Sequence, residues 1–206
     1  MAASAPEALV ALAGEAAVRG SAGAVRYVTW ALGNIADSDE GRAACVAARA
    51  PAALVALTGE AVMRGSAEAA EIARALGKIS GSAESIAALV VLAGEAAVRG
   101  SAGAAQTVAM ALYEIAFFNA EGEAACVAAR APAALVALAG EAAVRGSADA
   151  AQCVAKALYN ISLLPAGKSA CVEAGARAAL TALAAAPAVA ASAEASKWVR
   201  DALERL

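Results

Sequence analysis

The sequence predicts an all-α fold built from stacked three-helix repeats, and two observations lead to this expectation. Hydrophobic residues make up 62% of the 206 residues and aromatic residues only 3%, so the core must consist of small and aliphatic side chains. Alanine has the highest helix propensity, and almost no aromatic signal typical of strands is present. AACVAARAPAALVAL occurs identically at 43–57 and 124–138, and LAGEAAVRGSA at 12–22, 92–102 and 138–148. One structural unit is therefore used several times.

Stop signals in the second copy divide this unit into a short, a medium and a long helix. The short helix, GRAACVAA, ends near Arg49, and Pro51 stands in the first turn of the next helix, where a missing N–H is tolerated. We expect that second helix to run to Arg64, with Gly65 ending it in a left-handed conformation and Ser66 capping the third helix. The same Arg-Gly-Ser junction recurs at 19–21, 99–101 and 145–147.

Two of the units are shorter than the others. The first begins at Pro6 without a short helix, and the third passes from Ile79 to Ile86 with no room for one, so we expect a two-helix unit there. The chain is then a single repeat domain, residues 1–206. The expected units are approximately 1–38, 39–81, 82–119, 120–164 and 165–206.

The third helix carries a recurring A-L-x-x-I frame, which reads TWALGNIA at 29–36 and KALYNIS at 156–162. With GRAACVAARAPAALVAL before it, this pattern resembles the armadillo-repeat family of the importin alpha and beta-catenin type. The resemblance covers essentially the whole chain. It implies a right-handed α-solenoid in which the third helices pave a concave groove.

The resemblance also implies which residues face that groove. In the family, a tryptophan and an asparagine of the third helix do so, and Trp30 and Asn34 match them. These two residues are four apart and so lie on one helix face. The corresponding positions of the other copies, which vary most between the units, are Arg74, Lys78, Met110, Glu114, Lys156, Asn160, Asp201 and Arg205. Residues five positions before the frame leucine, among them Tyr27 and Trp198, should border the same surface.

Two classes of function follow from this resemblance. The first is a non-enzymatic protein interaction module that holds an extended peptide or partner segment in the groove. The mildly positive groove positions favour a peptide with acidic residues. The alternative is a structural or engineered scaffold without a natural ligand. Because the first unit exposes a face that another repeat normally covers, we also expect end-to-end self-association.

Composition argues against other classes of function. The net charge is −3 and the cations are scattered, so no basic stripe favours nucleic acid. Charged residues interrupt nearly every window long enough to cross a membrane. The start of the chain lacks a secretory signal pattern, so we expect a cytosolic or nuclear protein.

Catalytic and metal-binding chemistry also has little support in the sequence. The absence of histidine removes imidazole bases and histidine ligands. Cys45, Cys126 and Cys171 fall at equivalent positions, Cys153 stands on a third helix, and none forms a Cys-x-x-Cys pair. We interpret them as buried hydrophobic residues. We expect no cofactor, no metal and no enzymatic activity.

Overall fold

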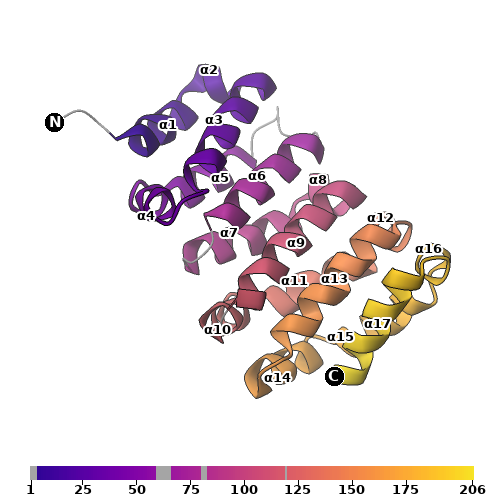
Figure 1. The fold of residues 1–206 in the computed structure, drawn as a ribbon. Helices are drawn as coiled ribbons and strands as arrows, with labels where there is room; N and C mark the ends of the chain where they lie inside the picture. The colour runs from indigo at the N-terminus through magenta and orange to yellow at the C-terminus, as the bar shows by residue number, and fades with distance from the viewer. Residues whose placement is uncertain (1–3, 59–65, 80–82, 119) are drawn as a thin grey trace.

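The computed structural model describes residues 4–58, 66–79, 83–118 and 120–206, and within them every regular element is an α-helix. The helices stack into a solenoid with the two ends of the chain at opposite ends of the stack (Figure 1). The predicted all-α solenoid is thereby confirmed. The predicted unit boundaries at 81–82 and 119 fall outside the described residues and stay predictions.

The helices follow the chain repeat by repeat. The first repeat contains α1 (Ala5–Gly14), α2 (Ala16–Arg19) and α3 (Ala22–Ile35). The second contains α4 (Asp39–Ala47), α5 (Ala50–Thr58) and α6 (Ser66–Lys78). The third contains α7 (Ala83–Gly94), α8 (Ala96–Arg99) and α9 (Ala102–Phe118). The fourth contains α10 (Ala120–Ala128), α11 (Ala131–Gly140), α12 (Ala142–Arg145) and α13 (Ala148–Ile161). The fifth contains α14 (Pro165–Glu173), α15 (Ala176–Ala184), α16 (Pro187–Ala190) and α17 (Ala193–Arg205).

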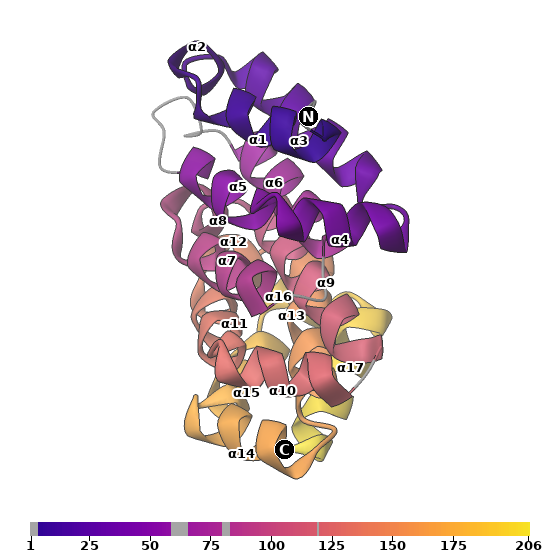
Figure 2. The ribbon, with the colours of Figure 1, turned by 90° about the vertical axis from the view of Figure 1, so that its left-hand side faces the viewer.

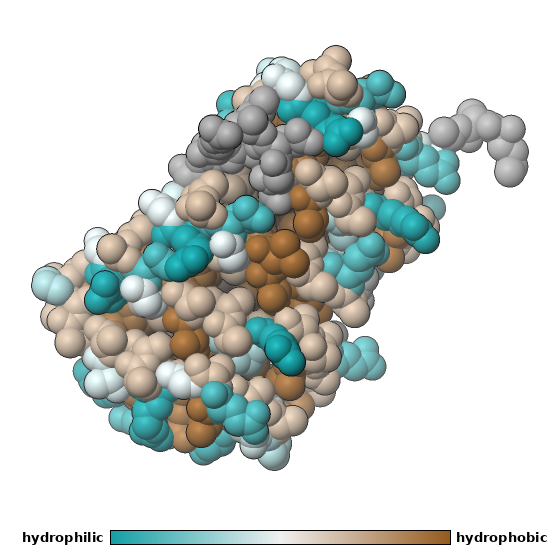
Figure 3. All heavy atoms as spheres, turned by 180° about the vertical axis from the view of Figure 1, so that it is seen from behind, coloured by the Kyte–Doolittle hydropathy of each residue, from teal (hydrophilic) through white to brown (hydrophobic). Residues whose placement is uncertain are grey.

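The long third helices form one layer of the solenoid. Helices α3, α6, α9, α13 and α17 pack in this order, each against the next, and face the viewer in Figure 1. The second helices α1, α5, α7, α11 and α15 form the layer behind them and also pack in order. Figure 3 shows this rear face, where pale alanine surface alternates with scattered hydrophilic side chains and some strongly hydrophobic ones. The core lies between the two layers, where the frame leucines Leu32, Leu76, Leu112 and Leu158 are fully buried.

Serine caps begin the third helices, as the sequence predicts. Ser21, Ser101 and Ser147 each accept a hydrogen bond at 3.3 Å from the backbone amide three residues later. Each bond satisfies one of the free N–H groups of the first turn. Ser192 caps α17 in the same way. In the second copy of the junction, Arg64 and Gly65 lie outside the described residues.

The prediction of one continuous second helix is wrong. In the first repeat the helix ends at Gly14, Glu15 is extended (φ −70°, ψ 134°), and α2 then forms one further turn. The same Gly-Glu pair breaks the helix at residues 94–95 and 140–141. Glycine costs about 1 kcal/mol in a helix interior relative to alanine, so the pair is a weak point at which the chain bends toward the third helix. In the second repeat the structure describes this helix only as far as Thr58, so its predicted end at Arg64 lies outside the described residues.

The third repeat has no described counterpart of the short helices α4, α10 and α14, as expected, but its second helix is broken into α7 and α8, so the described repeat has three helices rather than the predicted two. Its second helix, α7, begins at Ala83, and the buried Ser85 hydroxyl donates to the carbonyl oxygen of Ile79 at 3.3 Å. In the second and fifth repeats a cysteine of the short helix lies instead against the carbonyl oxygen of the frame leucine of the preceding third helix. The Cys45 thiol lies 3.8 Å from the carbonyl oxygen of Leu32. Ser85 therefore covers the end of α6 where the short helix is missing.

The turn between the short and second helices requires a left-handed residue. Gly175 takes this conformation at φ 82°, whereas Arg49 and Arg130 adopt it at φ 59° and 61°. A residue with a Cβ is disfavoured there by about 1–2 kcal/mol, since the Cβ approaches the following carbonyl oxygen. Two of the three turns therefore carry backbone strain that glycine would remove.

We predict that Arg49→Gly and Arg130→Gly each raise the free energy of unfolding by about 0.5–1 kcal/mol, because the relief of strain exceeds the entropy that glycine adds to the unfolded chain. Urea titration followed by circular dichroism measures the change. Gly175→Arg is the reverse control and should lower stability by a similar amount. An unchanged or lower midpoint for both arginine variants would contradict the assignment.

A second glycine position lets the short helix approach the end of the third helix. A Cβ added at Gly41 would lie 1.8 Å from the carbonyl oxygen of Ile35, and one at Gly167 would lie 1.6 Å from that of Ile161. Beside Gly167 the buried carboxylate of Glu123 accepts a hydrogen bond from the Leu164 amide at 2.7 Å. These two positions therefore exclude any side chain.

Gly41→Ala and Gly167→Ala should each lower the free energy of unfolding by about 2 kcal/mol or more, because a backbone carbonyl has to move to admit the methyl group. Gly103→Ala is the matched control, since nothing lies within 4 Å of its added Cβ and alanine favours the helix. Thermal unfolding of the three variants would test the assignment. Equal effects at positions 41 and 103 would refute it.

Candidate functional site

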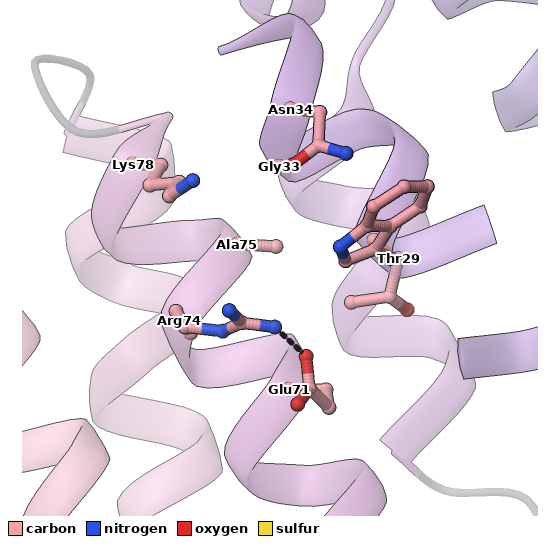
Figure 4. Close-up of a pocket in the computed structure, with 8 residues that line it drawn as sticks. Thr29, Gly33, Asn34, Glu71, Arg74, Ala75 and Lys78 are labelled. Atoms are coloured by element: carbon pink, nitrogen blue, oxygen red, sulfur yellow. Dashed lines mark hydrogen bonds and ion pairs between the residues drawn. The ribbon is translucent and has the colours of Figure 1, made fainter. Parts of the chain in front are cut away.

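Two adjoining depressions lie on the third-helix face in the N-terminal half of the solenoid. The first is shallow, with a volume of about 10 Å³, and lies between α3 and α6; Figure 4 shows it with Asn34 and Lys78 on opposite sides. Its lining consists of Thr29, Trp30, Gly33, Asn34, Glu71, Arg74, Ala75 and Lys78. The second, of about 340 Å³, lies between α6 and α9 and is lined by Arg74, Gly77, Lys78, Gln106, Thr107, Met110, Ala111 and Glu114. Arg74 and Lys78 line both depressions. The two depressions therefore form one surface, which we call the groove.

Small residues at one repeated position bring the helices of the groove together. Gly33 follows the frame leucine of α3, and a Cβ added there would lie 3.6 Å from the Cβ of Ala75. Gly77 is the equivalent residue of α6, and its added Cβ would lie 2.8 Å from the Cβ of Ala111. In α9 and α13 the same position is a tyrosine, so the later repeats carry a large ring where the groove has none.

All three predicted residues on α3, Tyr27, Trp30 and Asn34, are exposed. The Trp30 side chain is 57% exposed, and Asn34, one helical turn further along, is also exposed. An exposed indole is uncommon because it leaves a large apolar surface in contact with water. Tyr27, which is 75% exposed, continues this aromatic surface toward the N-terminal end.

The cations of the groove are paired with neighbouring carboxylates. Arg74 forms an ion pair with Glu71 on the same helix (Figure 4). The Lys78 ammonium lies 2.7 Å from the carboxylate of Asp37, in the turn after α3. All four side chains remain partly exposed, and exposed ion pairs contribute only about 0–1 kcal/mol. These pairs can therefore exchange for a ligand carboxylate at little cost.

Met110 and Glu114 close the groove on α9. Met110 is half-buried and packs against the core, and Glu114 is exposed. Partial burial raises the pKa of the Glu114 carboxyl above its ordinary value. An apolar and an acidic group therefore stand at the C-terminal edge of the groove.

In the C-terminal half of the solenoid, the predicted site residues contact one another. The Trp198 ring meets Tyr159 edge to face, with centroids 5.9 Å apart, and the Lys156 ammonium lies 5.1 Å from the Trp198 ring centroid. Lys156 also lies 3.9 Å from the carboxylate of Glu194. The aromatic face and the cation that a ligand would use are occupied by neighbouring repeats.

Asn160, Asp201 and Arg205 differ from the predicted exposed ladder. Asn160 is only 3% exposed, because α13 is packed between α9 and α17. Its amide nitrogen has no hydrogen-bond partner. Asp201 is half-buried, and the Arg205 guanidinium donates to the carbonyl oxygens of Ser162 and Leu163 at 3.2 and 2.5 Å. Asn160 and Asn34 occupy the same position in their repeats, but Asn160 is buried and Asn34 is exposed.

Sequence reasoning missed the residues that determine where the surface is hollow. Gly33 and Gly77 belong to the A-L-x-x-I frame and were not considered as site residues. The signal was present in the comparison of copies: the position after the constant leucine is glycine in the first two repeats, tyrosine in the third and fourth, and glutamate in the fifth. Gln106 of the second depression was also missed, whereas its neighbour Thr107 lies five positions before the frame leucine Leu112 and was expected to border the groove.

The described residues offer little for metal or thiol chemistry. Among them, no three cysteine, aspartate or glutamate residues lie close enough to hold a metal ion. All four cysteines are buried and unpaired. Burial raises the pKa of Cys126 and Cys171 to about 12 and that of Cys153 to about 11, which keeps the thiols protonated near neutral pH.

No single helix of the described residues is long and apolar enough to cross a membrane. Helices α10 and α11 reach the required length and composition only as a pair, which is bent by 71° at its break.

Comparisons with solved structures identify the fold. A designed armadillo repeat protein, YIII(Dq.V1)4CPAF in complex with the peptide (KR)4, shares 28% sequence identity at a TM-score of 0.69. The alignment covers 98% of this chain and 81% of that one. The chain has an armadillo-like repeat fold. A second designed armadillo repeat protein, YIII(Dq)4CqI, aligns at 26% identity and a TM-score of 0.67, over 98% of this chain and 82% of that one.

The armadillo-like assignment has further structural support. An engineered protein solved by a structural genomics consortium shares 27% identity at a TM-score of 0.70, over 98% of this chain and 80% of that one. No protein-family model and no curated protein sequence matches the chain. The armadillo-like resemblance read from TWALGNIA is therefore confirmed by structure.

The two tryptophans should differ sharply in their contribution to stability. Trp198→Ala removes the ring contact with Tyr159 and the Lys156 contact from a half-buried site, so we expect a loss of about 2–3 kcal/mol. Trp30→Ala removes a mainly exposed ring and should change stability by at most about 0.5 kcal/mol. Urea unfolding of both variants measures the difference. A larger loss at Trp30 would show that its ring is a structural element.

Proposed function

We propose that this armadillo-like protein is a non-enzymatic interaction module that binds an extended peptide in the groove formed by α3, α6 and α9. One observation carries the proposal: the exposed indole of Trp30 and the exposed amide of Asn34 lie one helical turn apart in a depression that α6 completes. Aromatic side chains are enriched at the centres of protein interfaces.

The chemistry of the two residues suits an extended chain. A peptide without internal hydrogen bonds presents a free N–H and a free C=O at each residue, and a carboxamide such as that of Asn34 can donate and accept. The Trp30 ring offers an apolar wall for one peptide side chain. Cations of the peptide could also lie over its face.

Two cations at the centre of the groove, Arg74 and Lys78, offer partners for acidic residues of a peptide, beside the lining carboxylates of Glu71 and Glu114. Arg74 and Lys78 line both depressions and are held only by exposed ion pairs, so a peptide carboxylate can replace Glu71 or Asp37. The designed protein that was solved with (KR)4 binds a wholly basic peptide. In this chain a basic peptide would meet the two cations at the centre of the groove, where like charges repel.

The test is a selection of random extended peptides on the intact protein, followed by affinity measurement with the enriched peptides. We expect enrichment of acidic over basic sequences and a dissociation constant that rises about tenfold or more in Trp30→Ala and in Asn34→Ala. Titration calorimetry at two salt concentrations measures the affinity and its electrostatic part. Arg74→Glu and Lys78→Glu should invert the charge preference.

Asn160→Ala is the matched control for Asn34→Ala. The residue type and the repeat position are the same, but Asn160 is buried outside the groove, so its replacement should leave the affinity unchanged. Equal losses in both variants would contradict the groove as defined here. If no peptide is enriched, the alternative of a repeat scaffold without a ligand takes precedence, which the engineered structural neighbours support.

A further inference from the structure

The two ends of the stack show which positions face which neighbour. The first repeat has a neighbour only on its C-terminal side, and the fifth only on its N-terminal side. A position that is exposed in the first repeat and buried in the fifth must therefore be covered by the preceding repeat. The reverse pattern marks positions that the following repeat covers.

The first pattern defines an N-side face of α1, α2 and α3. Leu12 is 47% exposed, whereas its equivalents Leu57, Leu92, Leu138 and Leu183 are all fully buried. Ala5 is exposed where Ala176 is fully buried. Leu9, Val18, Ala24, Ala31 and Ile35 are partly exposed where their equivalents in the fifth repeat are buried. Tyr27 belongs to the same face, because its equivalent Trp198 contacts Tyr159 of the preceding repeat.

The reverse pattern defines a C-side face of α15 and α17, which is strongly polar. Arg200 and Glu204 are exposed where Thr29 and Gly33 of the first repeat are buried. Arg177 is exposed where the equivalent Pro6, Pro51 and Pro132 are buried. Thr181 replaces the valine found at this position in the other four repeats, and Leu203 is an apolar residue of the same face, partly exposed where Leu32 is fully buried.

The solenoid is therefore closed at one end only. The fifth repeat has exchanged its stacking residues for charged ones, which is how terminal repeats of solenoids keep their outer face in water. The first repeat has kept the residues of an interior repeat. Figure 2 shows α1, α2 and α3 at the top of the stack, with no described helix beyond them. An apolar stacking face is left in contact with water.

We propose that the N-side face docks onto the N-side face of a second copy of this chain. The argument is continuity with the interface inside the stack: Leu9, Leu12, Ala31 and Ile35 recur as the same residues in the second, third and fourth repeats, where all of their equivalents are buried. A two-fold arrangement lets the apolar α1 of each copy lie against the partner, with Leu12 and Tyr27 contributing the largest exposed areas. Such an interface uses one patch on both subunits and closes at the dimer.

Head-to-tail stacking does not fit the C-side face. Burying Arg200 and Glu204 against α1 and α3 would desolvate two charges that interior repeats lack. A head-to-tail stack would also lack the ion pair that links the Arg-Gly-Ser junction of one repeat to the next repeat. Between interior repeats the Arg99 guanidinium reaches the Glu141 carboxylate, with N–O distances of 2.5–2.7 Å. Ala190 and Ala191 replace the arginine and glycine in the fifth repeat, so its C-side cannot supply an arginine to Glu15.

Sedimentation velocity of the intact protein from low micromolar to near-millimolar concentration tests the proposal. We expect a concentration-dependent shift from one to two chain masses, with no growth beyond two. Leu12→Arg should raise the dimer dissociation constant about tenfold or more, because it places a charge in the centre of the face. Leu12 is already 47% exposed, and circular dichroism would confirm that the variant keeps its helices.

Two controls separate the proposed interface from other kinds of association. Val172→Arg changes a residue that is 51% exposed on α14, away from the N-side face, and should dimerise as the unaltered protein does. Arg200→Glu alters the C-side face and should also have no effect. A protein that stays monomeric throughout overturns the proposal. So does growth beyond the dimer, or an Arg200→Glu variant that is as disruptive as Leu12→Arg.

Discussion

The structure depends on the burial of each repeat against its two neighbours. No single repeat encloses a core: the frame leucines Leu32, Leu76, Leu112 and Leu158, each with a following repeat beside it, are fully buried, whereas Leu203 of the last repeat is only partly buried. Apolar burial contributes about 25 cal/mol per Å², so stability accumulates along the stack rather than at one centre. The residues at a repeated position therefore differ in environment according to their neighbours, even when their sequence is the same.

This dependence explains why the groove occupies only part of the third-helix face. Glycine at positions 33 and 77 leaves the surface between α3, α6 and α9 without large rings, and the side chains of Trp30 and Asn34 remain in water. Tyrosine at the equivalent positions 113 and 159 adds rings to the later repeats. Tyr113 stacks on Phe117 with centroids 5.6 Å apart, and Tyr159 meets Trp198. The change from glycine to tyrosine at this position thus separates a surface with exposed side chains from one on which aromatic side chains contact one another.

The groove and the N-side face meet on α3. Trp30 belongs to the groove, and Tyr27 belongs to the face that interior repeats bury. A two-fold dimer through the N-side face would bring the aromatic ends of two grooves to the same part of the assembly. Peptide binding and self-association would then involve neighbouring residues of one helix. Asn34→Ala tests peptide binding separately, and Leu12→Arg tests self-association separately.

The sequence alone determined the helical class, the repeat, the serine caps and the family resemblance, because each depends on residues close together in the chain. Alanine content, the Arg-Gly-Ser junction and the A-L-x-x-I frame are local signals, and so is the missing short helix before Ile86. Only the tertiary structure decided that the Gly-Glu pair breaks the second helix and that Asn160 is buried whereas Asn34 is exposed. The two asparagines have the same place in their repeats. What differs is the packing of neighbouring repeats around them, and exposure is a property of that packing rather than of the residue.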